Sequence, residues 1–173
     1  GGGMALARMK LAVTPIAGLH LADTEPVGDA RGRFERLFCE RDWSPLRETL
    51  RFVQVNLSTT ASLGAIRGLH YQRPPVAEAK LIRCVRGAVF DVAVDLRADS
   101  PTFLRWHAVE LDEHMPREVF IPEGFAHGFQ ALTDEAQLLY FHTAPWTPDA
   151  EGGLRHDEYA LAITWPMPAH SGS

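Results

Sequence analysis

The sequence predicts an all-β protein built as an antiparallel sandwich or barrel, and two observations carry this prediction. From about Phe52 onward, short segments rich in Val, Ile and Phe follow one another at close spacing, separated by Gly and Pro, which is typical of antiparallel β architectures. No segment of similar length carries apolar residues at helical spacing over three turns. The 173 residues are the length of one domain, so we expect a single domain over residues 4–173.

The expected elements follow in chain order. Residues 28–36, GDARGRFER, combine Gly and Asp turn signals with Phe34 and predict a strand or arm laid on the main sheet. Residues 43–49 predict a short helix, with Ser44 as its N-cap and Pro45 at its first position. Strands are then expected at 51–58, 67–72, 80–87, 88–97, 103–111, 117–122, 125–132, 136–143 and 161–165.

Composition limits the partners and the compartment. The net charge of −5 offers no clustered excess of Lys and Arg for nucleic acid or an anionic membrane, and the apolar runs are far shorter than the roughly 20 residues of a membrane span. Cys39 and Cys84 form no C-x-x-C motif. We therefore expect two buried, reduced thiols and a cytoplasmic protein. The opening GGG is expected to be a cloning scar, with natural translation starting at Met4 or Met9.

The alternation of side chains along two strands separates an apolar face from a polar one. Along 52–57, one face carries the amides of Gln54 and Asn56, and the opposite face is apolar. Along 89–96, one face is apolar and the other is small and partly acidic, with Asp91 on it. The polar faces either line a cavity or form the solvated outside, and alternation alone favours the solvated outside.

His70 is the first candidate for proton transfer, because imidazole titrates near neutrality. It lies in RGLHYQ, residues 67–72. A hydrogen-bonded strand histidine is the structural alternative, but the neighbouring Arg67, Gly68 and Gln72 weaken it. The segment is therefore a candidate for part of an enzyme active site.

His127 is the second candidate, in PEGFAHGF between Phe125 and Phe129. An imidazole among aromatic rings has a lowered pKa unless a carboxylate orients it, and the strand pattern makes Asp91 a plausible partner. A core histidine bonded to a backbone carbonyl fits these residues equally well.

Three further residue types suit an enolate or a phosphate. Lys80 is one of two lysines beside 15 arginines, and a compact ammonium can meet one developing oxyanion. A buried tyrosine hydroxyl such as that of Tyr140 can return a proton to an enolate, although most strand tyrosines lie in a core or at its rim. Arg31 and Arg67 stand beside glycines, where a forked guanidinium suits phosphate.

Motifs for cofactors and metals are missing from the sequence. It contains no G-x-G-x-x-G, P-loop, H-E-x-x-H or G-x-S-x-G motif. None of the eight histidines is spaced H-x-H, as a histidine-rich metal site in a double sheet would need. We therefore expect neither a cofactor nor a metal.

Four motifs together closely resemble the dTDP-4-dehydrorhamnose 3,5-epimerase family. They are RGLHYQRPP (67–75), AKLIRCVRGAVFDVAVDLRADSPTF (79–103), IPEGFAHGFQAL (121–132) and ITWP (163–166). The resemblance covers residues 29–166. It implies a cupin-type jelly roll, an active site without metal, and a homodimer whose N-terminal arm reaches the neighbouring subunit. It also implies a dTDP-linked 4-keto-6-deoxy sugar as substrate, epimerised at C3, C5 or both.

The resemblance also assigns roles to individual residues. His70 looks like the base that removes a proton beside the C4 ketone, and Tyr140 like the acid that returns one on the opposite face. Lys80 matches a lysine near the C4 oxygen, where positive charge stabilises the enolate. His127 and Asp91 match a second histidine and its acidic partner. The matched substrate and nucleotide contacts are Arg31, Phe34, Gln54, Asn56, Arg67 and Glu151.

This sequence departs from the family pattern at three places. Trp146 stands where the family commonly has a second tyrosine, linked with which carbons are inverted, so inversion at one carbon stays open. The family's aspartate that orients the catalytic histidine has no counterpart, because no carboxylate follows Glu158. Arg36 replaces an acidic residue of the N-terminal motif. A sugar-nucleotide binding protein without turnover and a metal-binding cupin are the alternatives to an epimerase.

Overall fold

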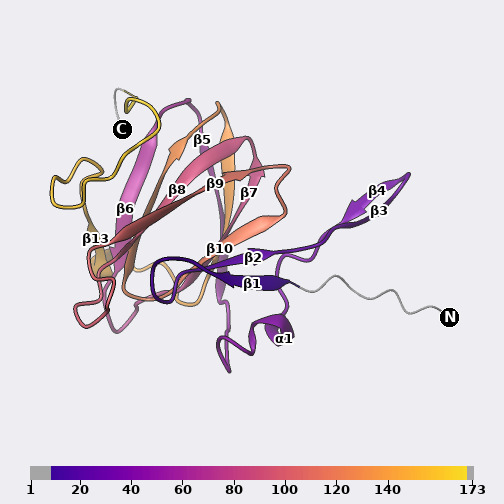
Figure 1. Ribbon diagram of the computed structural model, residues 1–173, viewed down its shortest axis with the longest axis horizontal. Coiled ribbons are helices and arrows are strands. Elements are labelled where there is room, and N and C mark those ends of the chain that lie inside the picture. Colours follow the sequence, from indigo (N-terminus) through magenta and orange to yellow (C-terminus); the bar gives the residue numbers. More distant parts are fainter. Residues whose placement is uncertain (1–8, 171–173) are drawn as a thin grey trace.

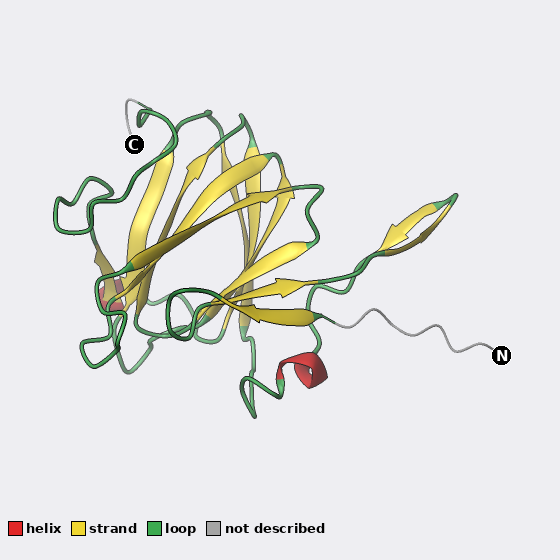
Figure 2. Cartoon of the chain, viewed as in Figure 1, coloured by secondary structure: helices red, strands yellow, loops and turns green. Residues whose placement is uncertain are grey.

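The computed structural model describes residues 9–170, in which strands predominate and helices are short (Figure 2). The expected scar at residues 1–3 lies outside the described part. The first strands are β1 (Lys10–Val13), β2 (His20–Asp23), β3 (Val27–Asp29) and β4 (Gly32–Phe34), followed by the helix α1 (Glu40–Trp43). The remaining strands are β5 (Gln54–Thr60), β6 (Ile66–Gln72), β7 (Lys80–Arg86), β8 (Ala88–Asp95), β9 (Trp106–Asp112), β10 (Arg117–Ile121), β11 (Phe125–Ala131), β12 (Ala136–His142) and β13 (Glu151–Gly153). A 3₁₀ turn, η1 (Pro148–Ala150), precedes β13.

Two antiparallel sheets form the body of the molecule. The six-stranded sheet has the order β1-β2-β10-β7-β12-β5, and the five-stranded sheet has the order β13-β6-β11-β8-β9. The chain crosses repeatedly from one sheet to the other, and the sheets face each other (Figure 1). The all-β antiparallel prediction is confirmed, and every segment expected to be a strand between residues 51 and 143 contains one.

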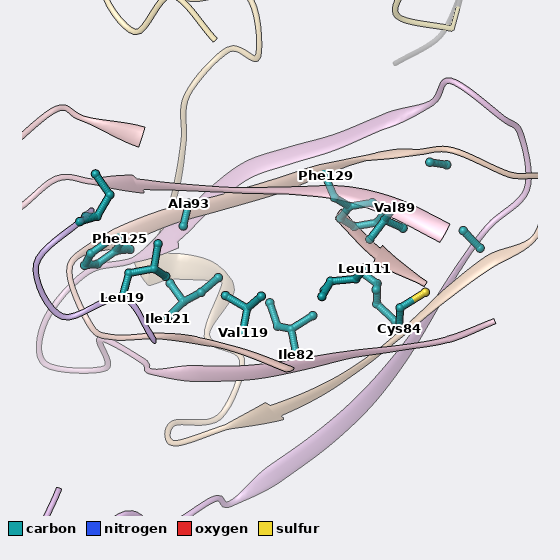
Figure 3. Packing of buried hydrophobic residues seen from close by; sticks show 14 residues of the cluster. Leu19, Ile82, Cys84, Val89, Ala93, Leu111, Val119, Ile121, Phe125 and Phe129 are labelled. Atoms are coloured by element: carbon teal, nitrogen blue, oxygen red, sulfur yellow. The ribbon is translucent and has the colours of Figure 1, made fainter. Parts of the chain in front are cut away.

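The apolar core lies between the sheets (Figure 3). Ile82 and Val119 from the six-stranded sheet meet Val89, Ala93 and other side chains of the five-stranded sheet. The acidic face of β8 therefore points inward, and the solvated reading of that face is wrong. The same reading is wrong for β5, because its amide-bearing face lines a cavity and its apolar side chains are exposed.

Irregular segments cover the outer faces of both sheets. Trp43 and Leu50 pack against Phe120 and other outward side chains of the six-stranded sheet. Leu161, from the C-terminal segment, is buried over the outer face of the five-stranded sheet. Because this segment packs through side chains and forms no ladder, the strand expected at 161–165 is absent.

Two local expectations in the N-terminal part are also corrected. The helix occupies 40–43, so Ser44 lies at its C-cap, and its hydroxyl donates to the carbonyl of Arg41 at 2.9 Å. Cys84 is buried as expected, whereas Cys39 is only half-buried, and both thiols are free.

Strands β3 and β4 form a separate two-stranded sheet rather than an addition to the main one. This hairpin arm, residues 27–34, projects away from the body (Figure 1), which corrects the expectation that it lies on the main sheet. Phe34 is 70% exposed, and Arg31 pairs with Asp29 within the arm at 2.6 Å. At the root of the arm, Arg83 of β7 donates to the carboxylate of Glu35.

Candidate active site

A cavity of about 230 Å³ lies between the two sheets, beside the apolar core. Strands of both sheets and the loop before β13 contribute to its wall. The lining residues are Asn56, Ser58, Arg67, His70, Tyr71, Gln72, Glu78, Lys80, His127, Phe129, Tyr140, His142, Trp146 and Glu151.

His70 enters the cavity from β6 beside a local irregularity of the ladder. His127 of β11 lies opposite His70, and the register shifts between His127 and Phe129. Gly68 has a φ of +106°, and a Cβ there would lie 2.6 Å from the carbonyl oxygen of His127, so only glycine fits this bend. The bend brings β6 close to β11 just before His70.

The surroundings of His70 favour a neutral imidazole. Burial lowers its pKa, and the positive charges of Lys80 and Arg67 act in the same direction, whereas Glu151 opposes them. The Glu151 carboxylate lies 3.9 Å from Nδ1 of His70. Its negative charge favours a proton on Nδ1, which leaves the lone pair of Nε2 free to act as a base.

Tyr140 enters from β12 on the opposite sheet. Burial raises the pKa of its hydroxyl well above the ordinary range, only partly offset by a hydrogen bond from Ser58, whose Oγ lies 3.4 Å from the phenol oxygen. Its ring stands edge-on to that of His127 at a centroid distance of 6.1 Å. The hydroxyl therefore stays protonated and can serve as a proton donor.

Lys80 opens β7 and lies directly across from His142 in the β7–β12 ladder. Its ammonium is almost buried and pairs with the Glu78 carboxylate at 3.5 Å. This places a positive charge in the cavity wall of the sheet that also carries Tyr140.

His127 forms a buried pair with Asp91 of β8. Its Nε2 donates to the carboxylate at 2.7 Å, and both side chains are almost fully buried. The structure thus brings together the two residues that the strand pattern paired, with His127 lining the cavity and Asp91 behind it.

Trp146 and Glu151 form the rim. The indole Nε1 of Trp146 donates to Glu151 at 3.1 Å, and its backbone N–H donates to the side-chain oxygen of Gln54 at 2.9 Å. Gln72 accepts from the backbone N–H of Thr147 at 2.9 Å. Gln54 therefore supports the rim loop rather than lining the cavity.

Most of the predicted site residues line the cavity, and four do not. Asp91 lies behind His127, and Gln54 supports the rim loop. Arg31 and Phe34 lie in the hairpin arm, outside the cavity of their own chain. The prediction that they contact the nucleotide stays a prediction.

Several lining residues were not predicted from the sequence, and Glu78 and His142 are the ionisable ones with polar partners among them. His142 follows Tyr140 by two positions and so shares its face of β12. Strand alternation could therefore have predicted that His142 lies in the same cavity wall. Glu78 lies in the loop before β7, where no alternation applies.

Within residues 9–170, no group of three or more His, Cys, Asp or Glu side chains is placed to hold a metal ion. None of the helices in this described range is long and apolar enough to cross a membrane.

Comparison with known proteins identifies the family of the chain that forms this cavity. The family model described as dTDP-4-dehydrorhamnose 3,5-epimerase matches residues 13–173. The chain belongs to this family. It is 40% identical to dTDP-4-dehydrorhamnose 3,5-epimerase of Sinorhizobium fredii, over 95% of this chain and 85% of that protein. It is also 40% identical to dTDP-4-dehydrorhamnose 3-epimerase of Streptomyces niveus, over 91% of this chain and 76% of that protein.

A solved structure of the family agrees with this fold. The crystal structure of dTDP-4-dehydrorhamnose 3,5-epimerase from Bacillus anthracis, with TDP and PPi bound, superposes with a TM-score of 0.88 at 38% identity and covers 93% of each chain. The expected cupin-type jelly roll and the expected enzyme class, an isomerase, are confirmed. The relatives include a 3,5-epimerase and a 3-epimerase at the same identity, so identity alone does not choose between the two.

Proposed function

We propose that this epimerase inverts a dTDP-linked 4-keto-6-deoxy-hexose at C3, C5 or both, with His70 as the base and Tyr140 as the acid. One observation carries the assignment: His70 and Tyr140 face the same cavity from opposite sheets. Inversion at a carbon beside a ketone requires a base on one face of the sugar and an acid on the other, and these walls supply them.

The proposed step conserves protons and charge. Nε2 of His70 removes the proton beside the C4 ketone, and the electron pair moves to the C4 oxygen to form an enolate. The ammonium of Lys80 stabilises this oxyanion. The Tyr140 hydroxyl then protonates the opposite face, and exchange with water resets both residues.

The cavity fits part of a nucleotide sugar rather than all of it. Its volume of about 230 Å³ is smaller than the roughly 300 to 1,000 Å³ of sites for drug-sized ligands. We place the sugar inside, with Asn56 as a contact. The guanidinium of the exposed Arg67 makes two long hydrogen bonds with β5, of 3.4 and 3.5 Å. We assign it to the diphosphate.

Hydrogen–deuterium exchange tests this function. On incubation with dTDP-4-keto-6-deoxyglucose in deuterium oxide, we expect deuterium at C3, C5 or both, resolved by NMR of the product. Incorporation at one carbon would identify a monoepimerase. Tight dTDP binding with no incorporation at either carbon would contradict the proposal and favour a binding protein without turnover.

We also infer a homodimer from two exposed features. Val55 and Leu57 on the outer face of β5 form an apolar stripe with Val53, which directly precedes the strand. Each is more than half exposed, and β5 is an edge strand. The hairpin arm projects away from the body of the molecule (Figure 1), and Arg31 and Phe34 do not line the cavity of their own chain, so we assign them to the cavity of another copy. A dimer explains both.

Charge placed in this stripe is expected to separate the subunits. Val55→Asp should shift the mass measured by light scattering after size exclusion from a dimer to a monomer, because a desolvated carboxylate at an interface has no partner. Val13→Asp is the matched control, on the strand at the opposite edge of the same sheet and 82% exposed. A monomeric unaltered protein, or a dimeric Val55→Asp protein, would contradict the inference.

A cytoplasmic location remains part of this proposal. Cys39 and Cys84 are both free thiols, and free cysteines are typical of reducing compartments. A single domain over residues 4–173 also stays a prediction from the sequence. The same holds for the expectation that the enzyme uses neither a cofactor nor a metal.

A further inference from the structure

We infer that Glu78 and His142 are positioning residues, which hold the ammonium of Lys80 and the amide of Asn56 in the orientations that the sugar meets. This inference rests on the proposed function and adds two residues to its machinery. Neither was assigned a role from the sequence, and both line the cavity.

Glu78 lies at the centre of a nearly buried polar cluster. One of its carboxylate oxygens is 3.0 Å from Nδ1 of His142, and the other is 3.5 Å from the ammonium of Lys80. The side chains of Glu78, Lys80 and His142 are only 8%, 11% and 11% exposed. One carboxylate therefore fixes two neighbours at once.

The backbone on both sides of this cluster is held in place. The N–H of Ala79 donates to Oγ1 of Thr143 at 2.8 Å, and the N–H of Thr143 donates to the carbonyl of Ala79 at 3.1 Å. These bonds tie the loop that carries Glu78 to the residue following His142. Lys80 and His142 are also paired directly across the β7–β12 ladder.

The ionisation of Glu78 determines which hydrogen each neighbour presents. Burial alone would raise the pKa of Glu78, but the hydrogen bond from His142 and the charge of Lys80 outweigh it and lower the pKa. A carboxylate only accepts hydrogen bonds, so Nδ1 of His142 is the donor in this contact, and the amide nitrogen of Asn56 can only donate to Nε2. Nε2 is then an acceptor, and the Asn56 Nδ2 at 3.2 Å donates to it.

This chain of bonds engages the amide nitrogen of Asn56, and within residues 9–170 no hydrogen bond is made by its side-chain oxygen. Asn56 lines the cavity, so it presents an acceptor to a sugar hydroxyl. The His142 ring also lies parallel to the ring of Tyr140, with an interplanar angle of 9° and a centroid distance of 5.8 Å. Glu78 and His142 thus reach Lys80, Asn56 and Tyr140, which all belong to the proposed site.

Stability alone does not account for this cluster. Removing a carboxylate, an ammonium and an imidazole from water is costly, and well-packed apolar side chains of similar volume are often as stable or more so. Apolar residues of this kind form the core between the sheets (Figure 3). The Glu78 cluster lies where Lys80 meets the cavity, which fits a role in positioning.

Glu78→Gln tests the effect on Lys80. We expect kcat for deuterium incorporation to fall by about 10- to 100-fold with little change in KM, as for a misplaced catalytic group. In a Lys80→Met background the same change should have almost no further effect on kcat, because the effect of Glu78 on kcat acts through Lys80. The matched control is Glu118→Gln, an identical change at a fully buried glutamate on the outer face of the same sheet, and it should keep its activity.

His142→Phe tests the effect on Asn56. It retains a ring beside Tyr140 but removes the bonds to Glu78 and Asn56, so KM should rise by about 10-fold, the loss expected for one hydrogen bond to the substrate. Circular dichroism and thermal unfolding confirm that each variant is folded.

The outcomes separate this inference from the function on which it rests. Full activity in both variants, or an equal loss in kcat from Glu78→Gln with and without Lys80, would overturn the positioning role while leaving the epimerase intact. Absence of exchange in the unaltered protein would overturn both.

Discussion

Replacement of His70 by alanine is expected to lower deuterium incorporation into the sugar by at least about 1,000-fold, because the proposed base is removed while the binding surface remains. Binding of dTDP should change little, since the proposed nucleotide contacts are other residues. The exchange rate is followed by NMR in deuterium oxide. Because burial and neighbouring charges lower the pKa of His70, the acid limb of kcat/KM for the unaltered enzyme is expected below pH 6.5, the ordinary value for histidine.

Two further variants make this experiment decisive. Glu151→Gln removes the carboxylate 3.9 Å from Nδ1 of His70 and is expected to reduce the rate by about 10-fold, since an orienting charge contributes less than the base itself. The control is His114→Ala, which changes an exposed histidine outside the cavity and should leave the rate unchanged. Retention of most of the exchange in His70→Ala would show that another group removes the proton.

Glu118→Gln is expected to make the protein progressively more stable than the unaltered chain as the pH rises. Glu118 is fully buried, and neither carboxyl oxygen has a hydrogen-bond partner among the described residues. Burial raises its pKa to about 9 from 4.5, partly opposed by the charge of Arg83 and reinforced by that of Glu35. At neutral pH the folded protein therefore holds a proton on Glu118 that the unfolded chain has lost.

The sign of the pH dependence follows from this proton. Below pH 4.5 both states are protonated, and above pH 9 both are ionised. Between these values the unfolded chain binds fewer protons, so the free energy of unfolding falls as the pH rises, by up to about 1.4 kcal/mol per pH unit. Glutamine cannot ionise, so the unfolding free energy of the variant does not fall with pH for this reason.

Chemical denaturation at pH 5, 6, 7 and 8 at one protein concentration measures the effect. The difference in unfolding free energy between Glu118→Gln and the unaltered chain should grow by up to about 4 kcal/mol from pH 5 to pH 8. Glu110→Gln, on the exposed side of β9, serves as the control and should show a nearly constant difference. Parallel stability curves for Glu118→Gln would show that Glu118 is ionised in the folded protein.

His70, Lys80, Asp91 and His127 could be named from the sequence because they lie in long motifs of unusual residues, whereas Tyr140 lies outside these motifs and was matched through the family resemblance. His70, Lys80 and Tyr140 all line one cavity in the structure, and Asp91 bonds to His127 as the strand pattern suggested. Glu78 was not predicted, because it lies in a loop, where neither strand alternation nor a motif indicates which way a side chain points.

The inward and outward faces of the strands were harder to predict. The apolar residues of β5 lie outside and its amides lie inside, which reverses the usual rule that apolar faces form the core. Alternation states that the two faces differ, but not which one a second sheet will cover. The segment at 161–165 likewise has the composition of a strand, yet it packs through Leu161 and Trp165 without joining a ladder.

The sequence by itself determined the all-β architecture, the positions of the main strands, and the residue types from which a proton-transfer site can be built. These depend on local alternation and on turn residues, which act over a few positions. Only the tertiary structure decided that β6 and β12 face each other across one cavity, that Glu78 reaches both His142 and Lys80, and that the arm stands away from its own site. Those arrangements follow from pairings between residues far apart in the chain, and no local preference encodes them.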